Sequence, residues 1–478
     1  MKFQKILVAV LICVMLILPS AALANVAADS GGGFPLTAAQ TIMVVTLLLM
    51  LSGKVPIYLT AAVGSIIAAI TAGFPLAAST SNWNVVFPLI VPAAPAGEPA
   101  VVTVGSLLIG SMHPVILDMM GVLLFIGVME KAGFLNAIII KVMQFGERVG
   151  RGPGVATAGG VAAGIIGGMT GFTQPAITAV ITAPPAVAMG VDKDKVAGVI
   201  AHAGHLGNFG GFTHPTLVNV VAMAGIGFGA INGIGAIVAL SIFAASYIRL
   251  TRQMKKEFGD AVVSGSGEQH IVDDTGISFG KAIAPFCVLL VGLIIGYPII
   301  VVGITAALLV VMMTTWDFIA GEKAMLEGLT RVTVPLLATI AFMFMSAVIA
   351  RVGLVAVLNS YLGEYLQAQP ILIMLLIGSV AGFITQSNGA SWPIIMPFLA
   401  AILEIPGVHP LVAAVAAAGG PAIMQYYLTG GPVAALATVI PVIPGSDLKA
   451  ANKFQRPSIV VGMVALFVIT YILKFILM

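Results

Sequence analysis

Long apolar stretches run through the whole chain and constrain its fold more than any other feature. A helix needs about 20 apolar residues to cross the hydrocarbon core of a bilayer. Ten stretches come near that length: 35–52, 55–76, 106–130, 195–223, 228–248, 282–297, 299–315, 332–350, 409–444 and 457–478. The sequence therefore predicts an all-α integral membrane protein whose chain crosses the bilayer ten times.

The amino-acid composition narrows the class of partner. Of the 478 residues, 59% are hydrophobic and only 8% are charged, too few to cover the surface of a soluble protein. The net charge of +3 comes with no basic cluster beyond 249–256, so we expect the lipid bilayer and not nucleic acid as a partner. Cys13 and Cys287 lie inside apolar runs, which predicts neither a disulfide framework nor a thiolate metal site.

The first 24 residues have the features of a signal peptide. Lys2 and Lys5 precede an apolar run at 6–18, and small residues lead to Ala24. We expect cleavage near Ala24, with a retained first transmembrane helix as the alternative. Such a start predicts a multi-pass protein of the bacterial inner (cytoplasmic) membrane.

Lysine and arginine give the orientation, because basic residues concentrate in cytoplasmic loops. They gather at 54, 131–195, 249–281, 323–331 and 449–456. The intervals without them fall where the apolar map places outward-facing loops or hairpins, and Arg351 is the one edge case. The topology that fits has both ends of the mature chain outside.

Short sequence matches divide the chain into two repeats. The segment VMEKAG at 128–133 is matched by VIARVG 220 residues later, at 348–353. Gly164 and Pro175 each recur 218 residues later. We therefore expect a first repeat at 35–248, a cytoplasmic linker at 249–281 and a second repeat at 282–478. An odd number of crossings per repeat inverts the second copy, as in many secondary transporters that work by alternating access.

Two apolar stretches, 155–190 and 371–402, are broken in the middle by Gly, Thr, Gln and Pro. We interpret both as re-entrant hairpins whose outgoing helices start at the break. Such helix starts present unpaired N–H groups and a partial positive charge, and they can hold an anion. The predicted substrate contacts are Thr173 and Gln174 in the first hairpin and Thr385, Gln386, Ser387, Asn388 and Ser391 in the second. The alternative is that these residues only cap helices and pack tightly.

Each hairpin is followed by a glycine-rich stretch, at 202–214 and 419–432. We predict two broken transmembrane helices, the first unwound around Asn208. Unwound backbone at membrane depth is tolerated where it is buried or lines a cavity. Asn208 and Thr429 are therefore expected to complete the pocket.

Four residues are candidates for coupling to an ion. Asp118 is ionisable at mid-membrane depth, which is costly and points to function, although a kink upstream could hydrate it. His202 and His205 have a proton-sensitive side chain, with helix-packing hydrogen bonds as the alternative. Thr170 lies on the incoming arm of the first hairpin, where oxygens could hold sodium. The histidines lack carboxylate or cysteine companions, so we predict no metal site, and no cofactor besides the coupling H+ or Na+.

The segment GFTQPAIT at 171–178, followed by a small-residue helix to Gly190, resembles the L-lactate permease family, which has a Gly-Phe-x-x-Pro hairpin there. The resemblance continues through the next broken helix and into 383–391, where that family has a turn with Ser and Asn. The architecture more broadly resembles the ion transporter superfamily, which includes carriers of dicarboxylates, citrate and gluconate and sodium/proton exchangers. This chain is shorter than typical lactate permeases and carries Thr-Gln at both hairpins.

Together these features predict an ion-coupled secondary transporter. The expected activity is symport of a small carboxylate such as lactate or glycolate with H+ or Na+. The alternatives are a Na+/H+-type cation antiporter that uses Asp118, and a carrier of di- or tricarboxylates or gluconate. An enzyme is not expected, because no nucleophile, base and orienting group can be assembled from the motifs. A homodimer is left open.

Overall fold

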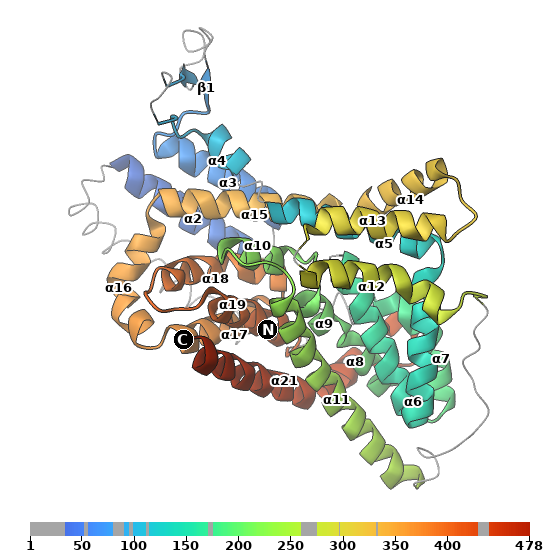
Figure 1. Cartoon of the computed structure of the whole chain (residues 1–478). Coiled ribbons are helices and arrows are strands. Elements are labelled where there is room, and N and C mark those ends of the chain that lie inside the picture. The colour runs from blue at the N-terminus through green and yellow to red at the C-terminus, as the bar shows by residue number, and fades with distance from the viewer. Residues whose placement is uncertain are drawn as a thin grey trace.

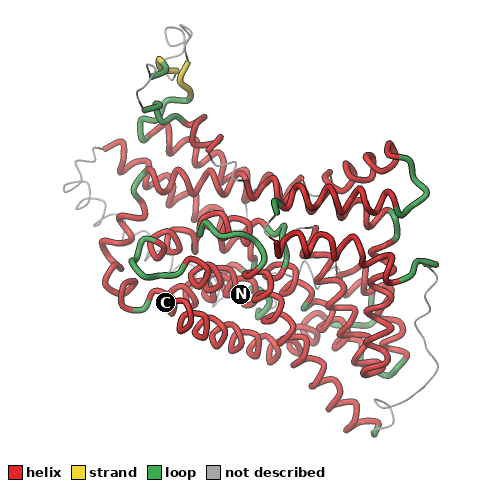
Figure 2. The backbone as a smooth tube through the Cα atoms, viewed as in Figure 1, coloured by secondary structure: helices red, strands yellow, loops and turns green. Residues whose placement is uncertain are grey.

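The computed structural model describes residues 34–51, 56–79, 90–94, 99–110, 114–170, 175–259, 275–295, 297–330, 333–428 and 439–478. Nearly all of this chain is helical (Figure 2). The exception, which the sequence did not predict, is a parallel pair of short strands, β1 (Ala77–Ser79) and β2 (Ile90–Pro92).

The helices divide at residues 260–274, which lie outside the described part of the chain. The first half contains α2 (Phe34–Leu51), α3 (Ile57–Thr71), α4 (Val104–Gly110), α5 (Pro114–Lys131), α6 (Phe134–Thr170), α7 (Pro175–Ala188), α8 (Lys193–Ala201), α9 (Ala203–Gly210), α10 (Pro215–Met223) and α11 (Ala230–Phe258). The second half contains α12 (Phe279–Ile295), α13 (Ile299–Met312), α14 (Phe318–Thr330), α15 (Thr333–Arg351), α16 (Leu354–Ala368), α17 (Pro370–Thr385), α18 (Asn388–Leu403), α19 (Pro410–Met424), the 3-10 turn η3 (Ile440–Val442) and α21 (Leu448–Leu477).

Few helices are long enough to cross a bilayer unbroken. Among the described residues, α11 and α21 are long and apolar enough to cross a bilayer. Two bent helix pairs raise the number of possible spans to four if each pair is counted as one span. Most other apolar helices have 10–17 residues. The stretch 195–223, which contains the predicted break, is divided into α8, α9 and α10. The run at 106–130 contains α4 and α5, and residues 111–113 between them lie outside the described part of the chain. Glycine and proline inside these runs end the helices early.

Three helical segments were missed by the search for apolar runs. They are the first part of α6 at 134–150, α14 and α16. Each carries charged residues, such as Glu147, Glu322 and Glu364, which lower its hydropathy. The helix α6 turns sharply at Gly150 and Arg151, where the backbone is not helical. Its second part and α7 therefore form the first hairpin.

Both bent pairs bend at the repeated sequence match. The pair α5 and α6 bends by 77°, and the pair α15 and α16 bends by 72°. Gly133 and Gly353 lie at these bends with φ of +76° and +73°, a left-handed conformation that favours glycine. The last glycine of each matched segment is therefore a structural requirement for the same bend in both halves.

The N-terminal helices of each half pack against the other half. On one side α3 packs on α15, and on the other α13 packs on α5 (Figure 1). The halves also contact each other at the bends. Gln40 of α2 donates from Nε2 to the carbonyl of Val352 at 2.7 Å. Ile277, just before α12, lies against Gly133. This reciprocal packing makes two lobes, and α11 and α21 run beneath them.

Candidate functional site

The second hairpin turns at Gln386 and Ser387, between α17 and α18. Gln386 has φ of +51°, and its backbone N–H closes the end of α17 on the carbonyl of Gly382. The Oγ of Ser387 accepts from the N–H of Ala390 at 3.3 Å, which caps α18. The helices extend over 370–403, close to the predicted hairpin at 371–402.

Three of the five residues predicted to touch substrate here hold the turn itself. Oγ1 of Thr385 and Oγ of Ser391 are 2.9 Å apart, and Ser391 Oγ donates to the carbonyl of Ser387 at 2.7 Å. The side chains of Gln386 and Asn388 differ. Both residues are buried, and no described residue hydrogen-bonds to Oε1 of Gln386 or Oδ1 of Asn388. Of the residues predicted at this tip, only Gln386 and Asn388 have a buried side-chain oxygen without a hydrogen-bond partner among the described residues. We call these two oxygens open.

The helix break in the first half lies beyond Asn208. Asn208 is buried within α9, so the expectation of unwinding around it is wrong. The extended stretch covers 211–214. It ends where Nδ1 of His214 accepts from the N–H of Thr216 and Pro215 occupies the first helical position of α10, because proline suits that position and cannot continue a preceding helix.

The freed backbone groups of this break find partners. Phe212 donates its N–H to the carbonyl of Gly168 at 2.7 Å, and the hydroxyl of Thr213 donates to the same oxygen at 3.2 Å. Asn232 of α11 donates to the carbonyl of Gly211. Gly168 belongs to the incoming arm of the first hairpin, so this hairpin and the break are joined. Such compensation is what irregular backbone needs at membrane depth.

Asn388 joins the tip of the second hairpin to the first-half break and to the end of α19. Its Nδ2 donates to Nδ1 of His214 at 3.2 Å, and its carbonyl accepts from the hydroxyl of Thr216 at 2.9 Å. Its backbone N–H donates to Oε1 of Gln425, in the turn after α19, at 2.9 Å. The starts of α10 and α18 therefore meet at one residue, and the joining hydrogen bonds involve no charged side chain.

The sequence missed Gln425, Thr216 and the bonding role of His214. Gln425 is in the predicted stretch 419–432, where Thr429 was chosen instead, and the His-Pro pair at 214 was the available signal of a helix start. Thr173, Gln174 and Thr429 lie outside the described residues. Thr170 ends α6, and its side chain is not among those described.

The two histidines predicted to couple to an ion lie together inside the protein. His202 is 0% exposed and His205 is 1% exposed. Their ring centroids are 5.3 Å apart, and the ring of Tyr426 lies 4.6 Å from that of His205. Neither histidine hydrogen-bonds directly to Asn388, yet Nδ1 of His205 is 3.2 Å from the carbonyl of Ala422, one turn before Gln425.

Asp118 has a structural contact with the other half of the chain. Its Oδ1 accepts from the backbone N–H groups of Ile299 at 3.0 Å and Ile300 at 3.4 Å. These are the first two residues of α13, so the carboxylate caps a helix start in the other half. A negative charge at a helix N-terminus is stabilising.

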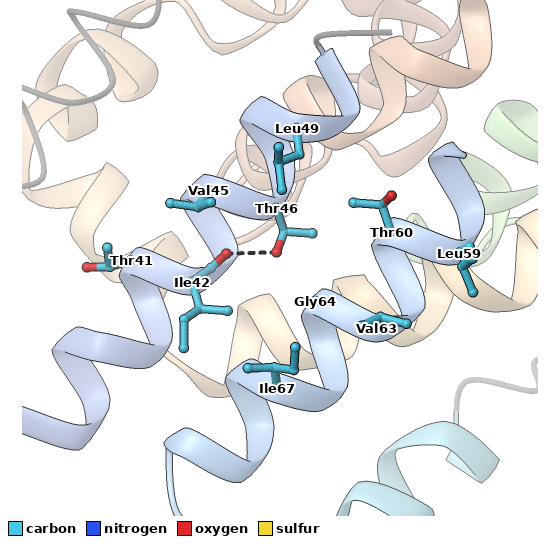
Figure 3. Close-up of a pocket in the computed structure, with 10 residues that line it drawn as sticks. All are labelled: Thr41, Ile42, Val45, Thr46, Leu49, Leu59, Thr60, Val63, Gly64 and Ile67. Atoms are coloured by element: carbon cyan, nitrogen blue, oxygen red, sulfur yellow. Dashed lines mark hydrogen bonds between the residues drawn. The ribbon is translucent and has the colours of Figure 1, made fainter. Parts of the chain in front are cut away.

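An apolar groove between α2 and α3 is an unsuitable carboxylate site (Figure 3). Its volume is about 460 Å³. The hydroxyls of Thr41, Thr46 and Thr60 each donate to the carbonyl four residues earlier in the chain, at 2.9, 2.7 and 2.8 Å. Leu59 and Ile67 on its rim are 56% and 48% exposed, which suits contact with lipid.

Comparison with known proteins shows the fold. No protein-family model matches the sequence, and no curated protein matches it in a sequence search. The structure is similar to the YdaH transporter of Alcanivorax borkumensis, with a TM-score of 0.53 and 13% identity over 91% of this chain and 98% of that chain. It is also similar to MtrF of Neisseria gonorrhoeae, described within a class of antimetabolite efflux pumps, with a TM-score of 0.57 and 11% identity over 93% and 96%. Over nearly its whole length, the chain has the helical fold of these two transporters.

Proposed function

We propose that the protein is a secondary active transporter of the bacterial inner membrane that carries a small carboxylate, such as lactate or glycolate, with H+ or Na+. The fold shared with YdaH and MtrF supports a transporter. The lactate permease-like motifs at the hairpins are the basis for the carboxylate.

The convergence at Asn388 is the observation that carries this proposal. Two helix N-termini, those of α10 and α18, meet there, and their partial positive charges favour an anion without a basic side chain. The open amide oxygens of Gln386 and Asn388 lie at the same tip, and oxygens of this kind bind cations such as Na+. A site with both features suits a carboxylate that travels together with a cation.

The two halves are expected to have the arrangement of a transporter that works by alternating access. We infer that they have opposite orientation in the membrane and that the substrate is bound where the hairpins and broken helices meet. The matched bends and the exchanged N-terminal helices support this inference. Transporters built from inverted repeats move one part against the other around a midplane site.

Uptake of radiolabelled lactate into proteoliposomes tests the proposal, first with an imposed proton gradient and then with a sodium gradient. We expect accumulation above the level of empty liposomes with one of the two gradients. Loaded vesicles placed in label-free buffer test export in the same preparation. Absence of both uptake and export, in vesicles shown to hold folded protein, would overturn the choice of substrate.

One substitution tests the site. Asn388→Leu removes the Nδ2 donor to His214 and the open Oδ1, so we expect uptake to be abolished while the protein still reaches the membrane. Asn136→Leu makes the same chemical change at an exposed position of α6 and is the matched control. Normal uptake by the Asn388 variant would remove the second hairpin from the site.

A further inference from the structure

The histidine pair at the junction of α8 and α9 has an unusual set of open nitrogens. His202 and His205 are buried, and His202 lies edge-on to Phe243 of α11 with ring centroids 6.0 Å apart. No described residue hydrogen-bonds to either ring nitrogen of His202 or to Nε2 of His205. A buried polar atom without a partner is destabilising. Three such atoms in two neighbouring rings therefore indicate a site that takes up something small and polar.

The contact of His205 fixes its tautomer. Nδ1 is 3.2 Å from the carbonyl oxygen of Ala422. A carbonyl can only accept, so Nδ1 carries the hydrogen and donates it. In the neutral ring the lone pair is then on Nε2, which is the nitrogen without a partner. Nε2 can accept a proton while the bond from Nδ1 stays in place.

The same carbonyl links His205 to the hairpin tip. Nε2 of Gln425 also donates to the oxygen of Ala422, at 3.1 Å. Through its Oε1, Gln425 accepts from the N–H of Asn388 at 2.9 Å. A chain of hydrogen bonds thus runs from His205 through Ala422 and Gln425 to Asn388.

We propose that His205, with His202 beside it, is a proton-binding site that controls how the tip of the second hairpin is held. A proton from water binds to Nε2 and makes the ring an imidazolium. The bond from Nδ1 to Ala422 then becomes charge-assisted, and such bonds are about twice as strong as neutral ones. His205 competes better for the shared carbonyl, and Gln425 holds Asn388 less firmly.

Burial and a nearby positive charge disfavour an imidazolium at the pair, so a bound proton is readily released. The titratable groups beside the pair are Arg249 of α11, whose positive charge opposes an imidazolium at His202, and Tyr426 after α19, whose ring lies 4.6 Å from that of His205. The inference deepens the proposed function by naming the proton as the coupling ion, and its link to transport rests on that function.

Fluorescence of Trp392 gives a readout that needs no substrate. Trp392 is buried on α18, one turn beyond Asn388. The parent protein for this test carries Trp83→Phe and Trp316→Phe, so Trp392 is its only tryptophan. It is placed in lipid nanodiscs and titrated from about pH 9 down to about pH 3, because burial disfavours the charged form of histidine. We expect one step in the emission as the pH falls.

Matched variants test which residue causes the step in the Trp392 emission. His205→Asn places an amide N–H where Nδ1 was but cannot take a proton, so the step should be lost. His409→Asn is the control: His409 caps α19, and asparagine caps a helix equally well, so the step should remain. Gln425→Met leaves both histidines and cuts the link to Asn388. The Gln425→Met variant should also lose the step. It replaces His205→Asn as the test if that variant does not fold.

A parent protein without a step, or a step that survives in His205→Asn or in Gln425→Met, would overturn the proposal. Because no substrate is present, that result would leave the transport proposal standing. Conversely, failed lactate uptake would not change the titration.

Discussion

At the residue scale, the structure separates polar side chains that are used in the fold from those that remain open. Thr385, Ser391 and Asp118 all satisfy neighbouring backbone or hydroxyl groups. Gln386 and Asn388 keep an open oxygen. All five were singled out by the sequence on the same ground, polarity in an apolar run, and only their contacts tell them apart.

Asp118 gives the prediction at this scale. In Asp118→Asn an oxygen can still accept from Ile299 and Ile300, while the charge at the start of α13 is lost. We expect a loss of about 0.3–1 kcal/mol of stability, visible as a slightly lower melting temperature in detergent, and uptake close to that of the parent. Asp118→Leu leaves the N–H groups without the side-chain acceptor and should cost about 1–3 kcal/mol.

The antiporter alternative makes the opposite prediction for this residue. If Asp118 carries the exchanged ion, Asp118→Asn abolishes transport at an unchanged melting temperature. That pair of results would exclude a purely structural role.

At the element scale, the apolar runs are interrupted by glycine and proline at places that matter for the packing. The breaks produce short helices that meet end to end, at the bends, at the hairpin tip and at 211–214. Each break leaves backbone groups that other helices must satisfy, as Asn232 and Gly168 do for the first-half break. The breaks are therefore places where distant segments are brought together.

The two bends can be compared directly by substitution. Gly133→Ala and Gly353→Ala both place a Cβ on a left-handed residue, which costs about 1–2 kcal/mol. We expect both variants to melt at a lower temperature by similar amounts. Gly363→Ala within α16 meets no neighbouring atom and should stabilise by about 0.5–1 kcal/mol. Unequal losses at the two bends would mean that they are not equivalent.

At the scale of the whole molecule, the two halves exchange their N-terminal helices and so form two interlocked lobes (Figure 1). Each bent pair packs against helices of the other half. The opposite orientation of the halves in the membrane is the property to test at this scale.

Labelling of single cysteines tests that orientation. In a background with Cys13→Ser and Cys287→Ser, Lys131→Cys and Arg351→Cys place thiols at repeat-related exposed positions. Because an inverted repeat puts related residues on opposite sides, we expect a membrane-impermeant maleimide added to spheroplasts to label position 351 and not 131. Permeabilised cells, where both should react, are the control. Labelling of both positions from the outside would mean that the halves are parallel.

The sequence by itself determined the membrane class, the helical fold, the approximate limits of the second hairpin and the matched glycines of the bends. These features depend on hydropathy and on backbone preferences within a few residues, which a single sequence contains. Only the tertiary structure decided which polar atoms meet. Asp118 and Ile299 are 181 residues apart, and His205 and Ala422 are 217 apart. Whether a side chain is satisfied or open depends on packing between such distant segments, and no local pattern encodes it.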